Sequence, residues 1–353
     1  MPTPTIADGS DYFDTALWTG DGASSRALTP YSFSPDFVWI KDRTSAFFHE
    51  LQDTVRGAGK RLSSDSTAAE DTSNQTLTAF SSTGFTVNFI SGYGRNTNEN
   101  NDAYVGWAWD AGSSTVSNTD GGTTASVRAN PTAGFSIVSW SGHGSGSTTI
   151  GHGLNAAPEL IILKGRDNVG AWAVGSDYIG WGNRLELNTT SASSSSPADF
   201  NSTAPTSSVF TVGSNQGSGN KIAYCFAPVA GYSAIGEYDG NGSTDGTFVY
   251  TGFRVAFLIL KCRTTTELWM MHDSARDPDN VVSKLIQPHT NDAEIDSVTN
   301  YGVDFLSNGF KFRSSSNRNN GSGQTYIYYA VAENPFQANG GLCLLYTSDA
   351  ADE

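Results

Sequence analysis

The chain has 353 residues, of which 35 are acidic and 20 basic, so its net charge is −15. This acidic balance argues against nucleic acid as a partner, because affinity for phosphate backbones comes largely from lysine and arginine. Hydrophobic residues make up only 37% of the chain, but 19 phenylalanines, 14 tyrosines and 8 tryptophans supply enough bulk to build cores. The 38 glycines are typical of short strands joined by tight turns.

The N-terminal residues and the cysteines give no sign of secretion or of a metal centre. "MPTPTIADGS" lacks the basic segment and apolar segment of a cleaved secretion signal. No run approaches the ~20 apolar residues that span a bilayer, so we expect no membrane insertion. Cys225, Cys262 and Cys343 form neither an even-numbered disulfide framework nor a pair at metal-ligand spacing. We therefore expect no metal and no cofactor.

A short apolar run that ends in Lys-x-Arg occurs three times: "PDFVWIKDR" at 35–43, "PELIILKGR" at 158–166 and "VAFLILKCR" at 255–263. Each is followed by a related run, "STGFTV", "SSVFTV" or "SNGFKF", and then by an aromatic run. The lysine of each copy precedes its aromatic run by 63, 57 and 65 residues. Spacing as well as spelling recurs, which indicates tandem repeats.

We interpret these echoes as three units, called unit 1, unit 2 and unit 3. The segment before unit 2, "SSTVSNTDGGTTASVRANPT", has hardly any large apolar group and is typical of a linker. The expected division is an N-terminal extension at 1–10, unit 1 at 11–112, a linker at 113–133, unit 2 at 134–231, unit 3 at 232–336, a truncated native end at 337–342 and a non-native tail at 343–353.

The last eleven residues, "CLLYTSDAADE", match neither the repeat nor the strand pattern. Written back as codons, they correspond to DNA that resembles a transposon-type sequencing adapter. We expect residues 343–353 to be an artefact at the end of a metagenomic fragment and to contribute nothing to the fold. Their removal takes away three carboxylates and no base, so the acidic balance remains.

The strong signals within each unit are those of strands. "FVWI", "LIIL" and "FLIL" are too short for helices and are bounded by turn residues, as expected of strands buried on both faces. "AFFHELQD", "GAWAVGSD" and "TELWMMHDS" are predicted to pair with them across short turns. Only "HELQDTVRGAGKRL" could hold a helical turn. Units of about 100 residues with closely spaced turns predict an all-β fold of three tandem β-sandwich or jelly-roll-like repeats.

The repeated strand also predicts where its residues lie. We expect Lys41, Lys164 and Lys261 to occupy equivalent strand ends, from which the lysine and the arginine emerge into solvent. The apolar positions of the echoed strands are expected in the core, namely Ile161, Leu163, Leu258, Leu260, Phe210 and Phe310.

The titratable residues form no complete catalytic or metal-binding pattern. "GHGSGS" lacks the spacing of a nucleophile elbow around Ser145. "EYDGN" at Glu237 and Asp239, and "EIDSV" at Glu294 and Asp296, each lack the final acid of the Glu-x-Asp-x-Glu strand of jelly-roll glycosidases. No paired metal-ligand spacing joins the five histidines, His49, His143, His152, His272 and His289.

Two other polar patterns have structural explanations. "DGNGSTDG" alternates oxygen side chains that could ring a Ca²⁺, at Asp239, Asn241, Ser243 and Asp245, but the other units close this turn with different residues, which favours a glycine-rich hairpin. Asp53 with Arg56 recurs as Asp273 with Arg276, and we interpret each pair as a loop staple worth about 1 kcal/mol or less if exposed.

The remaining candidates are tryptophans that could stack on a sugar and asparagines in glycosylation motifs. Trp172 and Trp269 follow the buried strand and are expected in the core, whereas Trp181, between glycines, is the best candidate for an exposed ring that stacks on a sugar; Trp140 is a further candidate. Five Asn-x-Ser/Thr sequences are interpreted as chance glycosylation motifs, at Asn74, Asn188, Asn201, Asn241 and Asn320.

As a set, "PDFVWIKDR", "DTVRGAGKRL", "YVGWAWDAG", "IGHGLNAAPELIILK", "YTGFR", "ARDPDNVV", "FLSNGFKFRSS" and "AENPF" resemble repeat domains of virion proteins of marine tailed phages, described as tail-fibre or structural proteins. The resemblance covers nearly all of residues 11–336 and supplies no catalytic residues. It implies location in the virion, or in the host cytoplasm during assembly, and other virion proteins as partners. It also suggests a host-surface glycan as a ligand and assembly as a homotrimer.

Three functions follow as hypotheses. The first is a non-enzymatic virion appendage protein, in which tandem copies lengthen a rod and multiply weak contacts with a host surface. The second is a carbohydrate-binding module, and the third is a glycan-degrading enzyme. Binding to glycans without release of sugar would favour the second, and new reducing ends on a host polysaccharide would favour the third.

Overall fold

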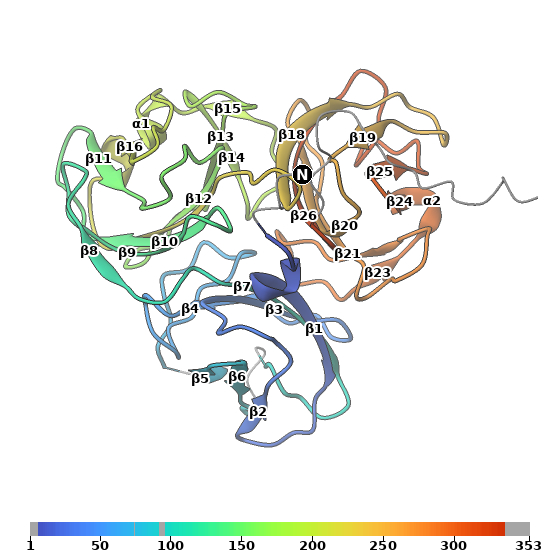
Figure 1. The fold of residues 1–353 in the computed structure, drawn as a ribbon, viewed down its shortest axis with the longest axis horizontal. Coiled ribbons are helices and arrows are strands. Elements are labelled where there is room, and N and C mark those ends of the chain that lie inside the picture. Colours follow the sequence, from blue (N-terminus) through green and yellow to red (C-terminus); the bar gives the residue numbers. More distant parts are fainter. Residues whose placement is uncertain (1–5, 74, 92–95, 336–353) are drawn as a thin grey trace, which may run out of the picture.

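A computed structural model of the chain describes residues 6–73, 75–91 and 96–335. The chain forms three lobes around a common centre, one for each run of strands that the sequence repeats (Figure 1). All the large elements are strands, which confirms the predicted all-β fold with β-sandwich units. The expected tail at 343–353, the end at 337–342 and Cys343 lie outside the described residues.

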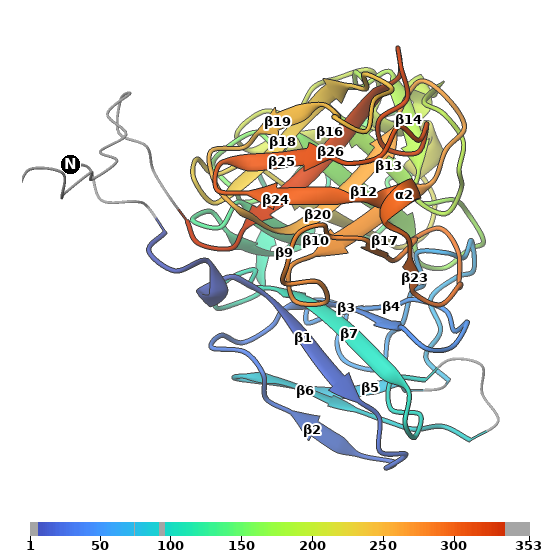
Figure 2. The ribbon, with the colours of Figure 1, turned by 90° about the vertical axis from the view of Figure 1, so that its right-hand side faces the viewer.

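Unit 1 has a main sheet and a smaller second sheet. The main sheet is antiparallel, in the order β1 (Phe13–Thr19), β7 (Ala103–Trp109), β3 (Phe37–Asp42) and β4 (Glu50–Asp53). The second sheet has the order β2 (Arg26–Leu28), β6 (Gly84–Val87) and β5 (Leu77–Ser81). Figure 2 shows β2, β5 and β6 as a separate layer beside β1 and β7. The short helix η1 (Gly9–Asp11) precedes β1.

Unit 2 is built around an eight-stranded sheet. Its order is β15 (Ser194–Ser195), β14 (Asn183–Glu186), β13 (Ala173–Ser176), β12 (Leu160–Gly165), β17 (Lys221–Phe226), β10 (Phe135–Trp140), β9 (Ala125–Asn130) and β8 (Val116–Asn118). Opposite this sheet lie β11 (Thr148–Gly151), β16 (Val209–Val212) and two short helices, α1 (Pro197–Phe200) and η2 (Ser214–Gln216).

Residues 113–133 were expected to form a linker, but they contain β8 and β9, which extend this sheet. Large side chains are not needed here, because the backbone pairs with β10 and the small residues Ala125 and Val127 point into the core. Arg128 of β9 also forms an ion pair with buried Asp36 of unit 1, at 2.8 Å. This segment is therefore tied to both neighbours.

Unit 3 repeats the plan of unit 1. The main sheet has the order β18 (Ser233–Asp239), β26 (Thr325–Ala332), β20 (Val255–Cys262) and β21 (Trp269–Asp273). The second sheet has the order β19 (Phe248–Tyr250), β25 (Gly309–Phe312) and β24 (Val303–Leu306). A two-stranded ladder of β22 (Lys284–Leu285) and β23 (Ile295–Asp296), and helix α2 (Val298–Tyr301), complete the unit. The helical turn considered near 49–62 is instead β4 and a turn.

The repeated strand occupies the same register in all three main sheets. Phe37 pairs with Trp109, Leu160 with Phe226, and Phe257 with Val331. Counting four residues from these pairs places Lys41, Lys164 and Lys261 at equivalent strand ends, as the sequence predicts.

Two kinds of core explain why the repeated strand is buried on both faces. Along β3, Val38 and Ile40 face the sandwich core of unit 1, whereas Phe37 and Trp39 face a central core that all three units share. This alternation follows from the two-residue period of a strand. The six residues predicted to be core are at most 1% exposed: Ile161, Leu163, Leu258, Leu260, Phe210 and Phe310.

The central core is a cluster of aromatic rings from all three main sheets. Phe37 of unit 1 stacks on Tyr224 of unit 2, with ring centroids 4.1 Å apart, and Phe226 of unit 2 lies 4.8 Å from Tyr329 of unit 3. An apolar cavity of only about 30 Å³ remains among these rings, roughly the room of a single water. The units thus close on one another and do not extend in a row as a rod would.

Candidate functional site

The ends of the three repeated strands meet neighbouring units, and their lysines do not emerge into solvent. Lys164 Nζ donates to the carbonyl of Thr67 in unit 1, and Lys261 Nζ to that of Thr190 in unit 2, each at 3.1 Å. Lys41 Nζ donates to the carbonyl of the next residue, at 2.7 Å. All three lysines are fully buried. The expectation that the lysines emerge into solvent was therefore wrong. The arginines of the three ends are partly exposed, at 18% for Arg43, 16% for Arg166 and 31% for Arg263.

The loops that meet these strand ends are named docking segments: residues 63–71 of unit 1, 186–195 of unit 2 and 287–294 of unit 3. Each docking segment donates a backbone N–H to the arginine carbonyl of a Lys-x-Arg end. The pairs are Glu70 with Arg166 at 2.7 Å, Ser193 with Arg263 at 3.0 Å and Glu294 with Arg43 at 3.0 Å. Unit 2 therefore docks on unit 1, unit 3 on unit 2, and unit 1 on unit 3, so the contacts form a closed cycle.

A ring nitrogen repeats the same cycle. Trp172 Nε1 donates to the carbonyl of Ser63 in unit 1 at 2.8 Å, and Trp269 Nε1 to that of Glu186 in unit 2 at 2.9 Å. Unit 1 has His49 at the equivalent position, and its Nε2 lies 3.0 Å from the carbonyl of Gln287 in unit 3.

The tautomer of His49 follows from its two neighbours. Trp39 Nε1 donates to His49 Nδ1 at 2.8 Å, so Nε2 carries the hydrogen and donates to Gln287. Burial and the charge of Lys41 hold the pKa of His49 well below its usual value. The imidazole stays neutral and acts as a fixed donor, like the two tryptophans.

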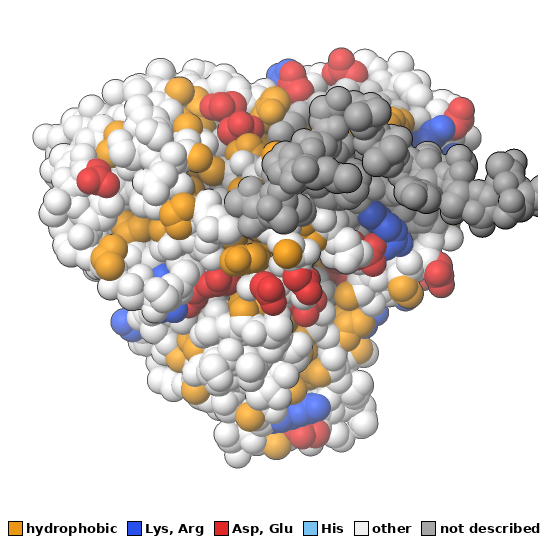
Figure 3. Space-filling model, in the orientation of Figure 1, with side chains coloured by type: hydrophobic (Ala, Val, Ile, Leu, Met, Phe, Trp, Pro, Cys, Tyr) orange, Lys and Arg blue, Asp and Glu red, His pale blue; other side chains and the backbone are white. Residues whose placement is uncertain are grey.

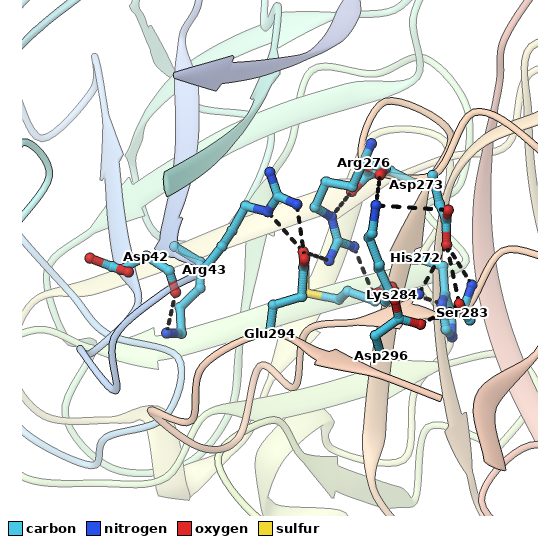
Figure 4. A network of polar contacts seen from close by, with 12 residues as sticks. Asp42, Arg43, His272, Asp273, Arg276, Ser283, Lys284, Glu294 and Asp296 are labelled. Atoms are coloured by element: carbon cyan, nitrogen blue, oxygen red, sulfur yellow. Dashed lines mark hydrogen bonds and ion pairs between the residues drawn. The ribbon is translucent and has the colours of Figure 1, made fainter. Parts of the chain in front are cut away.

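An ion network joins unit 1 to unit 3 beside these backbone contacts (Figure 4). The Glu294 carboxylate accepts two hydrogen bonds from Arg43, both at 2.8 Å, and one from Arg276 at 3.0 Å. Arg276 also donates to Asp273 at 2.6 Å, and Asp273 accepts from Trp107 Nε1 at 3.0 Å. The carboxylates and guanidinium groups are thus shared between the two units.

The contact between units 1 and 2 has the same design. Glu70 accepts from Arg166 at 2.8 Å and from Arg56 at 3.1 Å. Arg56 also donates to Asp53 at 2.5 Å and to the Tyr224 hydroxyl at 3.1 Å. The Asp–Arg pairs form the loop staples that the sequence predicts. Both pairs are fully buried and also contact the neighbouring unit, so the small contribution of an exposed pair does not apply to them.

The contact between units 2 and 3 lacks this network. Ser176, Ile179 and Ser193 of unit 2 stand where unit 1 has Asp53, Arg56 and Glu70. Arg263 of unit 3 instead forms an ion pair with Glu237 of its own unit, at 3.0 Å, and both side chains are about one-third exposed or more. One of the three contacts is therefore held without buried ion pairs.

The pKa shifts of Glu294 and Glu70 favour a structural role over proton transfer. Burial alone would raise the pKa of Glu294, but the hydrogen bonds and charges of Arg43 and Arg276 outweigh it and lower the pKa. The same balance, with Arg166 and Arg56, lowers the pKa of Glu70. A general acid of a glycosidase needs the opposite shift, so these carboxylates are placed to stay ionised.

The other catalytic candidates do not gather at one place. Glu237 forms its ion pair with Arg263, Asp239 accepts from Thr325 Oγ1 at 2.7 Å, and Asp296 accepts from Ser283 Oγ at 2.6 Å. Ser145 is exposed in the loop between β10 and β11.

The remaining histidines contact backbone or are buried in a neutral form. His143 is half-buried in the loop between β10 and β11, and His152 contacts the carbonyl of Thr206 at 3.1 Å. Burial lowers the pKa of His272 to about 3 and that of His289 to about 4, so both are neutral near pH 7. Within the described ranges, no three histidine, cysteine, aspartate or glutamate residues lie close enough to hold a metal ion.

The turn considered for Ca²⁺ is held by protein contacts. The Asp245 carboxylate pairs with Lys311 at 2.6 Å, and Asn241 Nδ2 donates to the carbonyl of Asp245 at 3.1 Å. The turn is thus closed by its own Asn241 and by Lys311 of the neighbouring strand β25.

Trp181 is not the exposed ring that the sequence suggests. It is only 6% exposed, stacks edge-on against Phe200 and donates Nε1 to Asp177 at 2.5 Å. Trp140 is buried too, and Trp172 and Trp269 are buried in the central core as expected. Asn320 is fully buried, which excludes it as a glycan acceptor in the folded chain; Asn74 lies outside the described residues.

The residues that join the units were missed by the sequence analysis. The repeated Arg of Lys-x-Arg was noticed, but its partners Glu70 and Glu294 lie 96 and 251 residues away from Arg166 and Arg43. One signal was available: a Glu follows the Asp–Arg pair by 14 residues in unit 1 and by 18 in unit 3, and unit 2 lacks all three residues.

Comparison with known proteins gives a family and no activity. No helix of the described chain has the length and apolar character to cross a membrane. No curated protein matches the sequence. A family model, described as a domain of unknown function (DUF7483), matches residues 8–335 and so spans all three units. Because the match covers nearly the whole chain, this protein belongs to the DUF7483 family.

Proposed function

We propose that this chain is a non-enzymatic structural segment of a phage virion appendage. The observation that carries the proposal is the closed cycle of docking contacts, in which each unit donates a backbone N–H to the Lys-x-Arg end of the next. The carboxylates of Glu70 and Glu294 are used in these contacts. The phage setting rests on the repeat motifs, which resemble those of tailed-phage virion proteins.

A rigid block with three similar units suits a load-bearing part. Tail fibres are commonly built around threefold axes, and here three units of one chain supply a comparable arrangement (Figure 1). Assembly of the chain into a homotrimer remains a prediction. Light scattering tests it, because the monomer has a mass of 37.4 kDa and a trimer three times that value.

The surface is consistent with the expected partners. On the face drawn in Figure 3, uncharged side chains predominate and basic side chains are few and scattered. Acidic side chains gather where the lobes meet on that face. Such a surface disfavours nucleic acid as a partner and leaves other virion proteins and host glycans as candidates.

Mass spectrometry of purified virions tests the virion proposal. Peptides from residues 11–336 should be present at a stoichiometry typical of a structural protein. Their absence from intact particles, with the protein found only in infected cells, would contradict the proposal. A separate assay tests the absence of catalysis: incubation with host polysaccharide should produce no new reducing ends. Reducing ends that Glu237→Gln or Glu294→Gln abolishes would contradict it.

A carbohydrate-binding module is the second candidate function. One observation favours it: unit 2 contains a polar cavity that opens to the surface and is lined by Lys221, Asn168 and Asn215, among others. Retention of the protein on a glycan array, without release of sugar, would support this candidate.

A further inference from the structure

Unit 2 contains a cavity of about 310 Å³. It lies between the start of β17, the loop that follows β12, and helices α1 and η2. Its volume is at the lower end of the range of small-ligand sites, about 300 to 1,000 Å³. Most of its lining is polar, including Asn168, Arg184, Asp199, Asn215, Gln216 and Lys221.

The corresponding place in units 1 and 3 is occupied by a tyrosine. Lys221 has the register position of Tyr104 and Tyr326. Tyr104 stacks on Trp18 at 5.3 Å, and its hydroxyl accepts from a backbone N–H at 2.9 Å. Tyr326 stacks on Tyr238 at 4.9 Å, and its hydroxyl accepts from a backbone N–H at 2.8 Å. In unit 2 a lysine replaces this packed ring.

The side chains that line the cavity are also smaller than their equivalents in the other units. Three lining residues of unit 2 are smaller than their equivalents: Gly165 against Asp42 and Cys262, Ala171 against Phe48 and Leu268, and Ala173 against Glu50 and Met270. A Cβ on Gly165 would lie only 3.3 Å from Lys221 Nζ, so the glycine leaves room for the ammonium group. Four changes in one unit thus open the same space.

Lys221 Nζ makes no direct contact with a carboxylate of the described residues, although Asp167 and Asp199 lie near enough to favour its charged form. Lys221 is only 8% exposed, and no hydrogen bond or ion pair joins its Nζ to the described part of the chain. Burial lowers its pKa, although Asp167 and Asp199 oppose this shift. The ammonium group thus faces the cavity without a hydrogen-bond acceptor from the described residues, and an anion in the cavity would supply one.

The one carboxylate in the lining is already satisfied. Asp199 Oδ1 accepts from Asn215 at 3.1 Å and from Gln216 at 3.0 Å. Asp199 Oδ2 accepts from Arg184 at 3.0 Å and from Ser196 at 2.6 Å. Asp199 is fully buried, and its carboxylate oxygens are occupied by these four donors. The cavity therefore presents the ammonium of Lys221 together with amide groups.

We propose that this cavity binds an acidic sugar, with the sugar carboxylate on the Lys221 ammonium and the ring hydroxyls on the amides of Asn168 and Asn215. The amides offer both donors and acceptors, which match hydroxyl groups better than a phosphate. Val169, which is 76% exposed on the lining, provides apolar contact for the C–H face of the ring. This inference deepens the second candidate function and does not depend on a virion role.

Saturation-transfer NMR and titration with D-galacturonate and D-glucuronate test the site in the full chain. The neutral sugars D-galactose and D-glucose, and acetate and inorganic phosphate, are the matched comparison ligands. We expect at least one of the two acidic sugars to bind. Its neutral counterpart and acetate should each bind at least about tenfold more weakly, since each lacks part of the recognised group. Equal or tighter binding of acetate or phosphate would overturn the assignment to a sugar, and so would the absence of any binding.

Two variants locate the site. Lys221→Met removes the charge but keeps the stem, and it should weaken binding by about tenfold to a hundredfold. Ala173→Met introduces the residue of unit 3 and should block the cavity while Lys221 stays in place. Lys311→Met, in the hairpin of unit 3, is the control and should bind like the wild type. Thermal unfolding confirms that each variant is folded. Unchanged binding in folded Lys221→Met or folded Ala173→Met would overturn the proposal.

Discussion

Replacement of Glu294 by serine tests the energetic role of the docking contacts. Ser193 is the natural equivalent in unit 2, so Glu294→Ser converts the contact between units 1 and 3 into the kind that joins units 2 and 3. The change removes an acceptor of three charge-assisted hydrogen bonds, two from Arg43 and one from Arg276. The backbone bond from residue 294 to Arg43 can remain.

The expected cost follows from the burial of the partners. Removal of one partner from a buried ion pair costs about 3–5 kcal/mol. Arg276 is fully buried but keeps Asp273, and Arg43 is 18% exposed and can reach solvent. We therefore expect the lower end of the range, about 3 kcal/mol of the free energy of unfolding.

Urea denaturation at pH 7 measures this cost, with Glu237→Ser as the matched control. Glu237 also pairs with an arginine, but the pair is 31% and 41% exposed, so its loss should cost about 1 kcal/mol or less. A double-mutant cycle with Arg43→Met should give a coupling energy above 1 kcal/mol. If Glu294→Ser is no more destabilising than Glu237→Ser, the ion network does not hold the units together.

Three further predictions concern the cores and the buried lysines. Leu163→Ala, at a position that is 1% exposed, should cost about 2–5 kcal/mol in urea denaturation; a cost near zero would show that β12 is not central to its sandwich. Burial lowers the pKa of Lys41 to about 8, so the unfolded chain holds this proton more tightly than the folded chain. Below pH 8 Lys41 is charged in both states, and the full cost of burying its charge lowers the stability of the fold. Between pH 8 and about 10.4 the wild type should gain stability relative to Lys41→Met, by at most about 1.4 kcal/mol per pH unit, and a difference independent of pH would contradict the low pKa. Because the units share a central core, calorimetry should give one transition with equal calorimetric and van't Hoff enthalpies, and three resolved transitions would refute a shared core.

The strands and the cores could be predicted from the sequence because their signals are local. Runs such as "LIIL" repeat with matched spacing, and the residues inside them, including Leu163 and Leu260, are buried as expected. The burial on both faces was also predictable from the absence of alternation in these runs. What covers the second face was not predictable, since Trp39 contacts residues of other units.

The docking contacts could not be predicted because they depend on the arrangement of whole units. Lys164 has the sequence context of an exposed strand end, and only the position of residues 63–71 of unit 1 explains its burial. The segment 113–133 looked like a linker for a similar reason. Its strand β9 is stabilised by pairing with β10 and by the contact of Arg128 with Asp36 of unit 1. Neither contact can be recognised from the local amino-acid composition.

The cavity of unit 2 could be predicted from the sequence only in part. The change from tyrosine to lysine at position 221 was visible in the aligned aromatic runs, but its meaning required the register of the sheet. The three smaller residues around it, at 165, 171 and 173, belong to β12, the loop that follows it and β13. Only the fold brings these four positions together.

Small-angle X-ray scattering of the full chain tests the closed arrangement of the three units most directly. A single body of 353 residues should have a radius of gyration of about 20 Å. Three units in a row, each with a radius of gyration of about 13 Å, would give roughly 30 Å. A value near 20 Å, with a distance distribution that has one maximum, is expected. A value near 30 Å would contradict the shared core and the cycle of docking contacts.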